Sequence, residues 1–177
     1  MVDEKSGSSI GVSDSHHHIH EGDSFEAIDM QTVSNTTQKW MITTPDTKRL
    51  AHMVFAVECT GEMLVLATEG ADRTGTTLLV PNNRNRVGIP ISPTTIVHRD
   101  ISGGASDGDI TLINKRVGAT DKFSAAMGEH RGENEFILKP NTKYILSVTT
   151  YAAVFVSLHL DWYEHEDRRT ENHFNVE

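Results

Sequence analysis

The sequence has a single cysteine, Cys59, among its 177 residues. One thiol excludes an internal disulfide bond and a zinc site built from several thiolates. Cys59 lies on the same alternation as Met53, Phe55 and Val57, and alternate residues of a strand share one face. We therefore expect a buried, unreactive thiol.

Long apolar runs and basic clusters are also missing. No run approaches the roughly 20 apolar residues of a membrane-spanning helix, and no basic-then-apolar signal segment opens the chain. The formal net charge is -9, and the one compact basic group is Arg84 with Arg86 in NNRNR. Binding to nucleic-acid phosphates requires clustered lysine and arginine. We therefore expect a soluble protein, made in a reducing cytoplasm, that binds neither nucleic acid nor a membrane.

Familiar catalytic motifs are absent as well. The chain contains no Gly-x-Ser-x-Gly elbow, no His-Glu-x-x-His helix and no phosphate-binding glycine loop. Glu164, His165 and Glu166 could supply an acid and a base, but the sequence offers no evident partner for them. We therefore expect a protein that is not an enzyme, with no catalytic residue, no metal and no cofactor.

The strongest positive feature is a period of two in residues 144–165, YILSVTTYAAVFVSLHLDWYEH. The second half of this segment divides into an apolar face with Val154, Val156, Leu158, Leu160 and Trp162, and a mixed face with Phe155, Ser157, His159, Asp161 and Tyr163. Such alternation of β-branched and aromatic residues predicts a long strand with one face in the core.

Shorter runs with the same alternation predict the rest of the fold. We expect the strand at residues 144–149 to pair with the long strand that follows it, and residues 52–60 to pair with residues 63–68, as two hairpins. Residues 121–127 are the one segment with a helical pattern. The spacing of the strands predicts an all-β protein, a two-sheet β-sandwich of about eight strands that is jelly-roll-like and has long loops.

Composition divides the chain into three parts. Residues 1–20 are expected to form an N-terminal arm, residues 21–165 the β-sandwich domain, and residues 166–177 a polar C-terminal tail. The first 15 or so residues are rich in Ser, Gly and Asp, a composition that cannot bury enough apolar surface to offset the entropy of ordering. We therefore expect the arm to be flexible unless a partner fixes it.

Histidines crowd the junction of arm and domain, in HHHIHEGDSF. On an extended strand His16, His18 and His20 share one face, as a metal site of imidazoles spaced by two requires. The following carboxylates do not match a cupin motif, because Glu21 comes too early and Glu26 too late. A threefold iron site, as in trimeric phage spikes, belongs to intertwined fibrous chains unlike this loop-rich sequence. We therefore favour a polar strand edge or an interface segment.

Four pieces of the sequence together resemble a family of small structural proteins of tailed phages and prophages. They are HHxIHEGDSF, TPDTKRLAHMVFAVE, the NRNR turn at residues 83–86, and LKPNTKYILSVT with LDWYEH. This resemblance implies a capsid decoration or cement protein that binds the outer surface of the virion, in contact with the major capsid protein and as a homotrimer. It carries over no catalytic residue.

Three functions remain as hypotheses at this point. The first is the capsid decoration protein, for which we expect the contact residues to be His16, His18, His20, Arg84 and Arg86. The second is a glycan-binding β-sandwich module on a phage fibre or head projection, with Trp40, Trp162 or Tyr163 stacking on sugars. The third is a cupin-like metal-binding enzyme that uses His16, His18 and His20.

Overall fold

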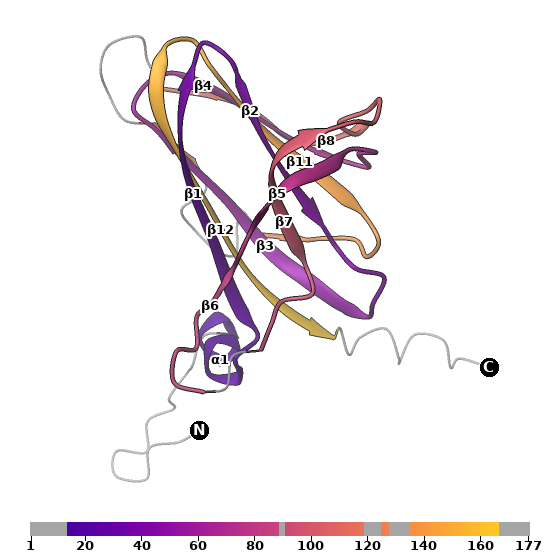
Figure 1. The fold of residues 1–177 in the computed structure, drawn as a ribbon. Helices are drawn as coiled ribbons and strands as arrows, with labels where there is room; N and C mark the ends of the chain where they lie inside the picture. Colours follow the sequence, from indigo (N-terminus) through magenta and orange to yellow (C-terminus); the bar gives the residue numbers. More distant parts are fainter. Residues whose placement is uncertain (1–13, 89–90, 119–124, 128–134, 167–177) are drawn as a thin grey trace, which may run out of the picture.

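Strands dominate the part of the chain described by the computed structural model, which comprises residues 14–88, 91–118, 125–127 and 135–166. The strands form two six-stranded sheets that pack face to face (Figure 1). All pairings between these strands are antiparallel. The predicted all-β, two-sheet sandwich is therefore confirmed.

We call the first sheet the β12 sheet, after its longest strand. Its strands follow the order β10, β3, β12, β1 and β6, and β9 also pairs with β3. Their bounds are β1 Ser24–Ser34, β3 Arg49–Cys59, β6 Asn82–Asn83, β9 Ala125–Met127, β10 Glu135–Ile137 and β12 Ala153–Glu166. The central strand β12 pairs with β1 on one side and with β3 on the other.

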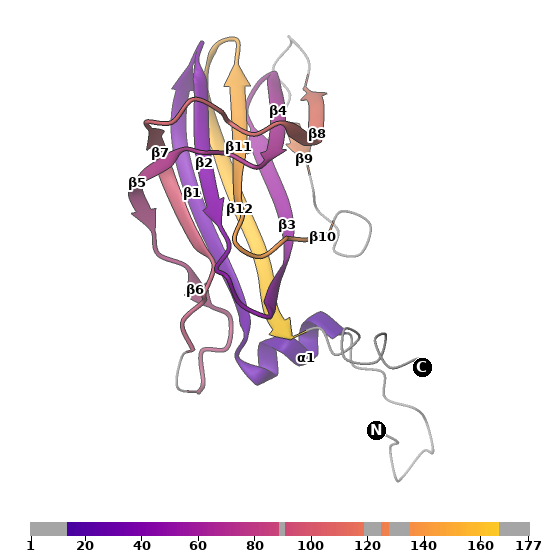
Figure 2. The ribbon, with the colours of Figure 1, turned by 90° about the vertical axis from the view of Figure 1, so that its right-hand side faces the viewer.

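We call the second sheet the β11 sheet, in which β11 lies between β2 and β4. Its strands follow the order β5, β7, β2, β11, β4 and β8. Their bounds are β2 Thr37–Thr43, β4 Met63–Glu69, β5 Thr74–Leu79, β7 Ile96–Ser102, β8 Ile110–Val117 and β11 Lys143–Thr150. Figure 2 shows the long strands of both sheets running along the same axis, with α1, Asp14–Glu21, the one helix among the described residues, at one end.

The order of the strands is that of a jelly roll. The chain crosses from one sheet to the other between β1 and β2, between β3 and β4, and between β11 and β12. These crossings place β1, β12, β3 and β10 in one sheet and β2, β11, β4 and β8 in the other, which gives the two-sheet, eight-stranded framework of that fold. The inserted strands β5 and β7 extend the β11 sheet beyond β2.

The core lies between the sheets and is built from the inward-facing half of each strand. β12 contributes four fully buried apolar side chains: Val156, Leu158, Leu160 and Trp162. Cys59 at the end of β3 is 3% exposed and is not in a disulfide, so the expected buried thiol is confirmed. Each large apolar side chain buried here contributes about 1.5–3 kcal/mol, and this shared interior holds the two sheets together.

Both predicted hairpins are wrong. β11 pairs with β2 and β4, whereas β12 pairs with β1 and β3. β3 and β4 also belong to different sheets. In each case the short turn joins two strands that belong to opposite layers of the sandwich, instead of two neighbours in one sheet. The alternation of apolar residues cannot distinguish a hairpin within one sheet from a connection between two sheets, because both bury the same set of side chains.

The helix lies in a different place from the one predicted. Residues 125–127 form the strand β9, and residues 121–124 lie outside the described part of the chain. The histidine-rich segment, predicted as a strand, forms α1 instead. Gly22 ends this helix with a φ of 81°. The amides of Gly22 and Asp23 donate to the carbonyl oxygens of Ile19 and His18 at 3.2 Å each, which is a Schellman cap.

A buried carboxylate closes the sandwich at the end where β12 finishes. Glu164 points inward and is fully buried. Its oxygens accept hydrogen bonds from the backbone amides of Thr94 and Thr95 at 2.9 and 2.8 Å, and from the Thr94 hydroxyl at 2.6 Å. Trp162 Nε1 donates to it at 3.2 Å. Glu164 therefore fixes the loop that leads into β7, which is a structural role for a carboxylate considered above as a catalytic acid or base.

Substitution of Glu164 by Gln tests this role through its dependence on pH. Burial raises the pKa of Glu164, but the hydrogen bonds from Thr94 and Thr95 outweigh it and leave the pKa below the usual value of 4.5. Hydrogen bonds to a charged group contribute about 1.5–3 kcal/mol, so we expect Glu164→Gln to lower the free energy of unfolding at pH 7 by about that amount. Because the folded pKa is lowered, the difference from wild type is full above about pH 4.5 and shrinks as the pH falls through the folded pKa. Urea unfolding of both proteins between pH 7 and pH 3 measures this difference in the free energy of unfolding.

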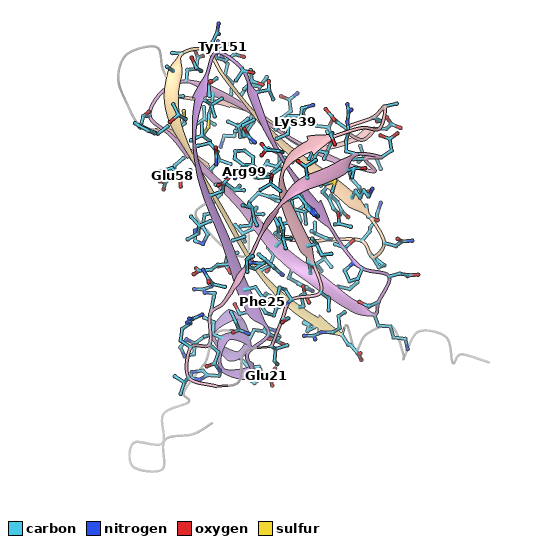
Figure 3. All side chains as sticks on the ribbon, viewed as in Figure 1. Glu21, Phe25, Lys39, Glu58, Arg99 and Tyr151 are labelled. Carbon is cyan, nitrogen blue, oxygen red and sulfur yellow. The ribbon has the colours of Figure 1, made fainter. Side chains whose placement is uncertain are left out.

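The matched control is Glu58→Gln. Glu58 is exposed on the outer side of β3, and Figure 3 shows its side chain at the surface of the molecule. We expect a change within about 0.5 kcal/mol for this variant, as for most surface substitutions. An equal loss of stability in both variants would contradict the structural role of Glu164.

Candidate interaction surface

The outer face of the β12 sheet carries the features that packing explains least. At one end α1 and the loop after β6 lie against the sheet, and toward the other end apolar side chains of β1 and β12 are exposed. Figure 3 labels Glu21 at the end that carries α1 and Tyr151 at the opposite end. We refer to this whole face as the candidate interaction surface.

One side of α1 is anchored to the sheet by His18. Its ring stacks on Tyr163 with ring centroids 4.1 Å apart and an angle of 9° between the planes. His18 Nδ1 lies 3.0 Å from Asp23 Oδ1, and the Tyr163 hydroxyl lies 3.1 Å from His52 Nδ1. His18 is only 6% exposed. The side chain of His18 therefore attaches the helix to the protein's own sheet.

The other side of α1 faces solvent and carries two pairs of side chains, each one helical turn apart. His16 Nε2 and His20 Nε2 are 2.9 Å apart, and His17 Nε2 lies 3.1 Å from Glu21 Oε1. All four side chains are exposed. The expectation that His16, His18 and His20 share one face is wrong, because residues four apart meet on a helix while residues two apart diverge.

The loop of residues 82–88 brings the predicted arginines next to this helix. Asn85 Nδ2 donates to the carbonyl oxygen of His20 at 3.0 Å, and Asn83 Nδ2 donates to that of Gly22 at 2.6 Å. Arg84 is half-buried and forms an ion pair with Asp161 at 2.8 Å, whereas Arg86 is exposed. The structure thus gathers the five predicted contact residues at one end, and it leaves His16, His20 and Arg86 accessible.

Sequence reasoning missed an exposed apolar strip made by Ile28, Met30 and Phe155. Ile28 and Met30 point outward from β1 and are 57% and 69% exposed, and Phe155 points outward from β12 and is 57% exposed. Met30 is opposite Ser157 in the β1–β12 register, which places Phe155 diagonally next to it on the same face. The alternation of the sequence already places these three residues on the outer face, because each is an odd number of positions away from the core residues of its strand.

The strip borders an open strand edge. In the described part of the chain β6 pairs with β1 only at Phe25 and Glu26, so no strand is paired with this edge of β1 from Ala27 to Ser34, although β5 passes close to β1. Behind this edge lies Asp29, a nearly buried carboxylate that points into the sandwich. Trp40 Nε1 and Arg99 Nη1 donate to it at 2.8 and 3.1 Å. These hydrogen bonds hold the middle of β1 in place from inside the sandwich, and the unpaired edge is the part of this strand that a partner strand could extend.

A metal site of the cupin type is not assembled by the three predicted histidines, because His18 points toward the sheet while His16 and His20 point away from it. The ligand atoms of His18, Glu21 and Asp23 lie within 4.8 Å of one another. In that group Asp23 is hydrogen-bonded to His18, whose ring is held by its stacking on Tyr163.

The three aromatic residues assigned to sugar binding are all buried. Trp40 and Trp162 are inside the core, and Tyr163 lies beneath His18. None of these rings presents a face to solvent on which a sugar ring could stack. The glycan hypothesis therefore loses the residues on which it depended.

Comparison with protein-family models, with curated proteins and with solved structures found no significant match to this chain. The phage-protein resemblance therefore stays a prediction. Among the helices of the described residues, none has the length and apolar character needed to cross a membrane.

The anchoring role of His18 is tested by His18→Ala. Removing the ring abolishes the stack on Tyr163 and the hydrogen bond to Asp23, which together contribute about 1–3 kcal/mol. Alanine has a higher helix propensity than histidine, so any loosening of α1 must come from lost docking. We expect amide hydrogen exchange in α1 to become at least about tenfold faster, as measured by mass spectrometry.

His17→Ala is the control for that measurement, because His17 lies on the same helix and faces solvent. It removes one imidazole without touching Tyr163, and we expect exchange in α1 to stay within about twofold of wild type. If both variants accelerate exchange equally, the helix is not anchored by His18.

Proposed function

We propose that this protein is a structural virion protein that binds the outer surface of a tailed-phage capsid and stabilises contacts between capsid subunits. The observation that carries the proposal is the strip of Ile28, Met30 and Phe155, next to the unpaired edge of β1. Contiguous apolar side chains on a soluble protein mark interaction sites. An open strand edge adds main-chain hydrogen bonds to such a contact.

The jelly-roll order supports the proposal by analogy. Jelly rolls occur in viral capsid proteins, but also in lectins and cupins, so the fold alone does not select a function. The surface favours the capsid among these three. The aromatic rings that would serve a lectin are buried, and the histidines that would serve a cupin do not converge.

A small contact surface is suited to a partner that presents many identical binding sites. Three apolar side chains and one strand edge give a limited area, and a single such contact is weak. On a symmetric shell, several copies joined in one oligomer bind with an effective affinity well above that of one site. The proposed partner is therefore the major capsid protein, and the proposed oligomer is a homotrimer that presents three strips.

Substitutions in the strip test the proposal. The purified protein is mixed with expanded capsids assembled from the major capsid protein of the same phage genome, the proposed partner, and binding is measured by co-sedimentation. We expect wild type to bind and to raise the temperature at which the capsids disassemble. Met30→Asp and Phe155→Asp each remove an apolar contact of about 1.5–3 kcal/mol, so we expect each to weaken binding at least about tenfold.

Leu78→Asp is the matched control, because Leu78 is 56% exposed on β5, in the other sheet. We expect it to bind capsids like wild type. Equal weakening by all three substitutions would show that the strip is not the contact. Failure of wild type to bind these capsids, together with its absence from purified virions, would overturn the proposed function itself.

A further inference from the structure

The solvent-facing side of α1 has a feature that capsid binding does not require. His16 and His20 lie one helical turn apart, with their Nε2 atoms 2.9 Å and their ring centroids 4.6 Å apart. The two Nε2 atoms share a hydrogen bond, which a metal ion bound between them would replace. Imidazole nitrogens are ligands for zinc and related divalent transition metals.

We propose that α1 binds a divalent transition-metal ion of the zinc class through the Nε2 atoms of His16 and His20. Zinc–nitrogen bonds of about 2.0–2.1 Å in tetrahedral geometry place two ligand nitrogens about 3.4 Å apart. The two rings therefore have to separate by only about half an ångström from the distance in the structure, a change within reach of small side-chain rotations. The two remaining coordination positions are open to water or to a donor from another molecule.

The helix holds these two ligands in advance of binding. Its end is fixed by the Schellman cap at Gly22, and its opposite side is fixed by the His18–Tyr163 stack. Asn85 of the neighbouring loop also donates to the His20 carbonyl oxygen. Ligands placed in advance lose little conformational entropy on binding, which raises the affinity for the ion.

One carboxylate on the helix favours a cation, and of the two arginines on the neighbouring loop Arg84 is paired with Asp161. Glu21 lies on the same exposed side of the helix, paired with His17 at 3.1 Å, and the whole chain carries a formal charge of -9. A carboxylate near a bound cation stabilises it. The site is thus different from the group of His18, Glu21 and Asp23, in which His18 is buried and bonded to Asp23.

The test uses the full chain, stripped of metal and titrated with zinc chloride at pH 7.5 in a non-chelating buffer by calorimetry. We expect one binding event that is weakened at least about tenfold by His16→Ala and equally by His20→Ala, since loss of even an outer partner of a metal ligand costs 10–100-fold in affinity. Hydrogen exchange supplies a second measurement, and we expect saturating zinc to slow exchange in α1 of wild type but not of His16→Ala.

Two further variants separate the alternatives. His17→Ala removes a neighbouring imidazole, and Asp23→Asn alters the buried group while it keeps an acceptor oxygen for His18. We expect both to bind zinc within about threefold of wild type. The proposal is overturned if no saturable binding occurs, if His16→Ala and His20→Ala bind like wild type, or if Asp23→Asn alone abolishes binding.

Discussion

The alternation of side chains along β12 is the constraint on which the rest of the molecule depends. Its inward residues, Val156 to Trp162, fill the middle of the core, and Glu164 continues the same face to fix the loop before β7. Its outward residues cannot contribute to that core. Phe155 is left in solvent, and Tyr163 becomes the surface on which α1 docks. Because β12 also pairs with strands on both sides, a shift of one residue would disturb the core and the surface together.

The layered fold was predictable, and the path of the chain was not. A period of two in β12 and β3 identifies strands that each bury one face, and enough such strands require two packed sheets. The same period does not indicate which strands are neighbours in a sheet. β11 and β12 are joined by a short turn that favours a hairpin by length, yet each strand has its ladder partners elsewhere, in β2 and β4 for β11 and in β1 and β3 for β12. That choice is made by the long-range packing of whole sheets, which local sequence does not encode.

The sequence singled out the residues at one end of the candidate interaction surface, but it indicated neither their geometry nor the apolar strip. Unusual composition drew attention to the histidines and to Arg84 and Arg86, and the structure places them at one end. Spacing by two favoured a strand, but spacing by four, from His16 to His20, also matches a helix, and Gly22 after Glu21 is a typical helix end. Giving weight to that glycine would have favoured the helix. Ile28 and Met30 were missed because a single exposed apolar residue is common, and only the register with Phe155 joins them into a strip.

The residues that stabilise the fold and the residues proposed to bind partners lie on opposite faces of the β12 sheet, so the two roles can be tested separately. Buried polar groups that hold the fold, such as Asp29 and Glu164, point inward, whereas Met30, Phe155, His16 and His20 are exposed. Changes at exposed positions alter the free energy of unfolding by about 0.5 kcal/mol or less, so a loss of binding there cannot be attributed to unfolding. The helix docks at Tyr163, which is opposite Ser24, whereas Met30 and Phe155 lie at least six residues further along the same strands, and distant sites without shared partners usually act additively. The proposed capsid binding and the proposed metal binding can therefore be tested one at a time, and the effect of each substitution on the other activity will show whether the two ends of the face serve one function.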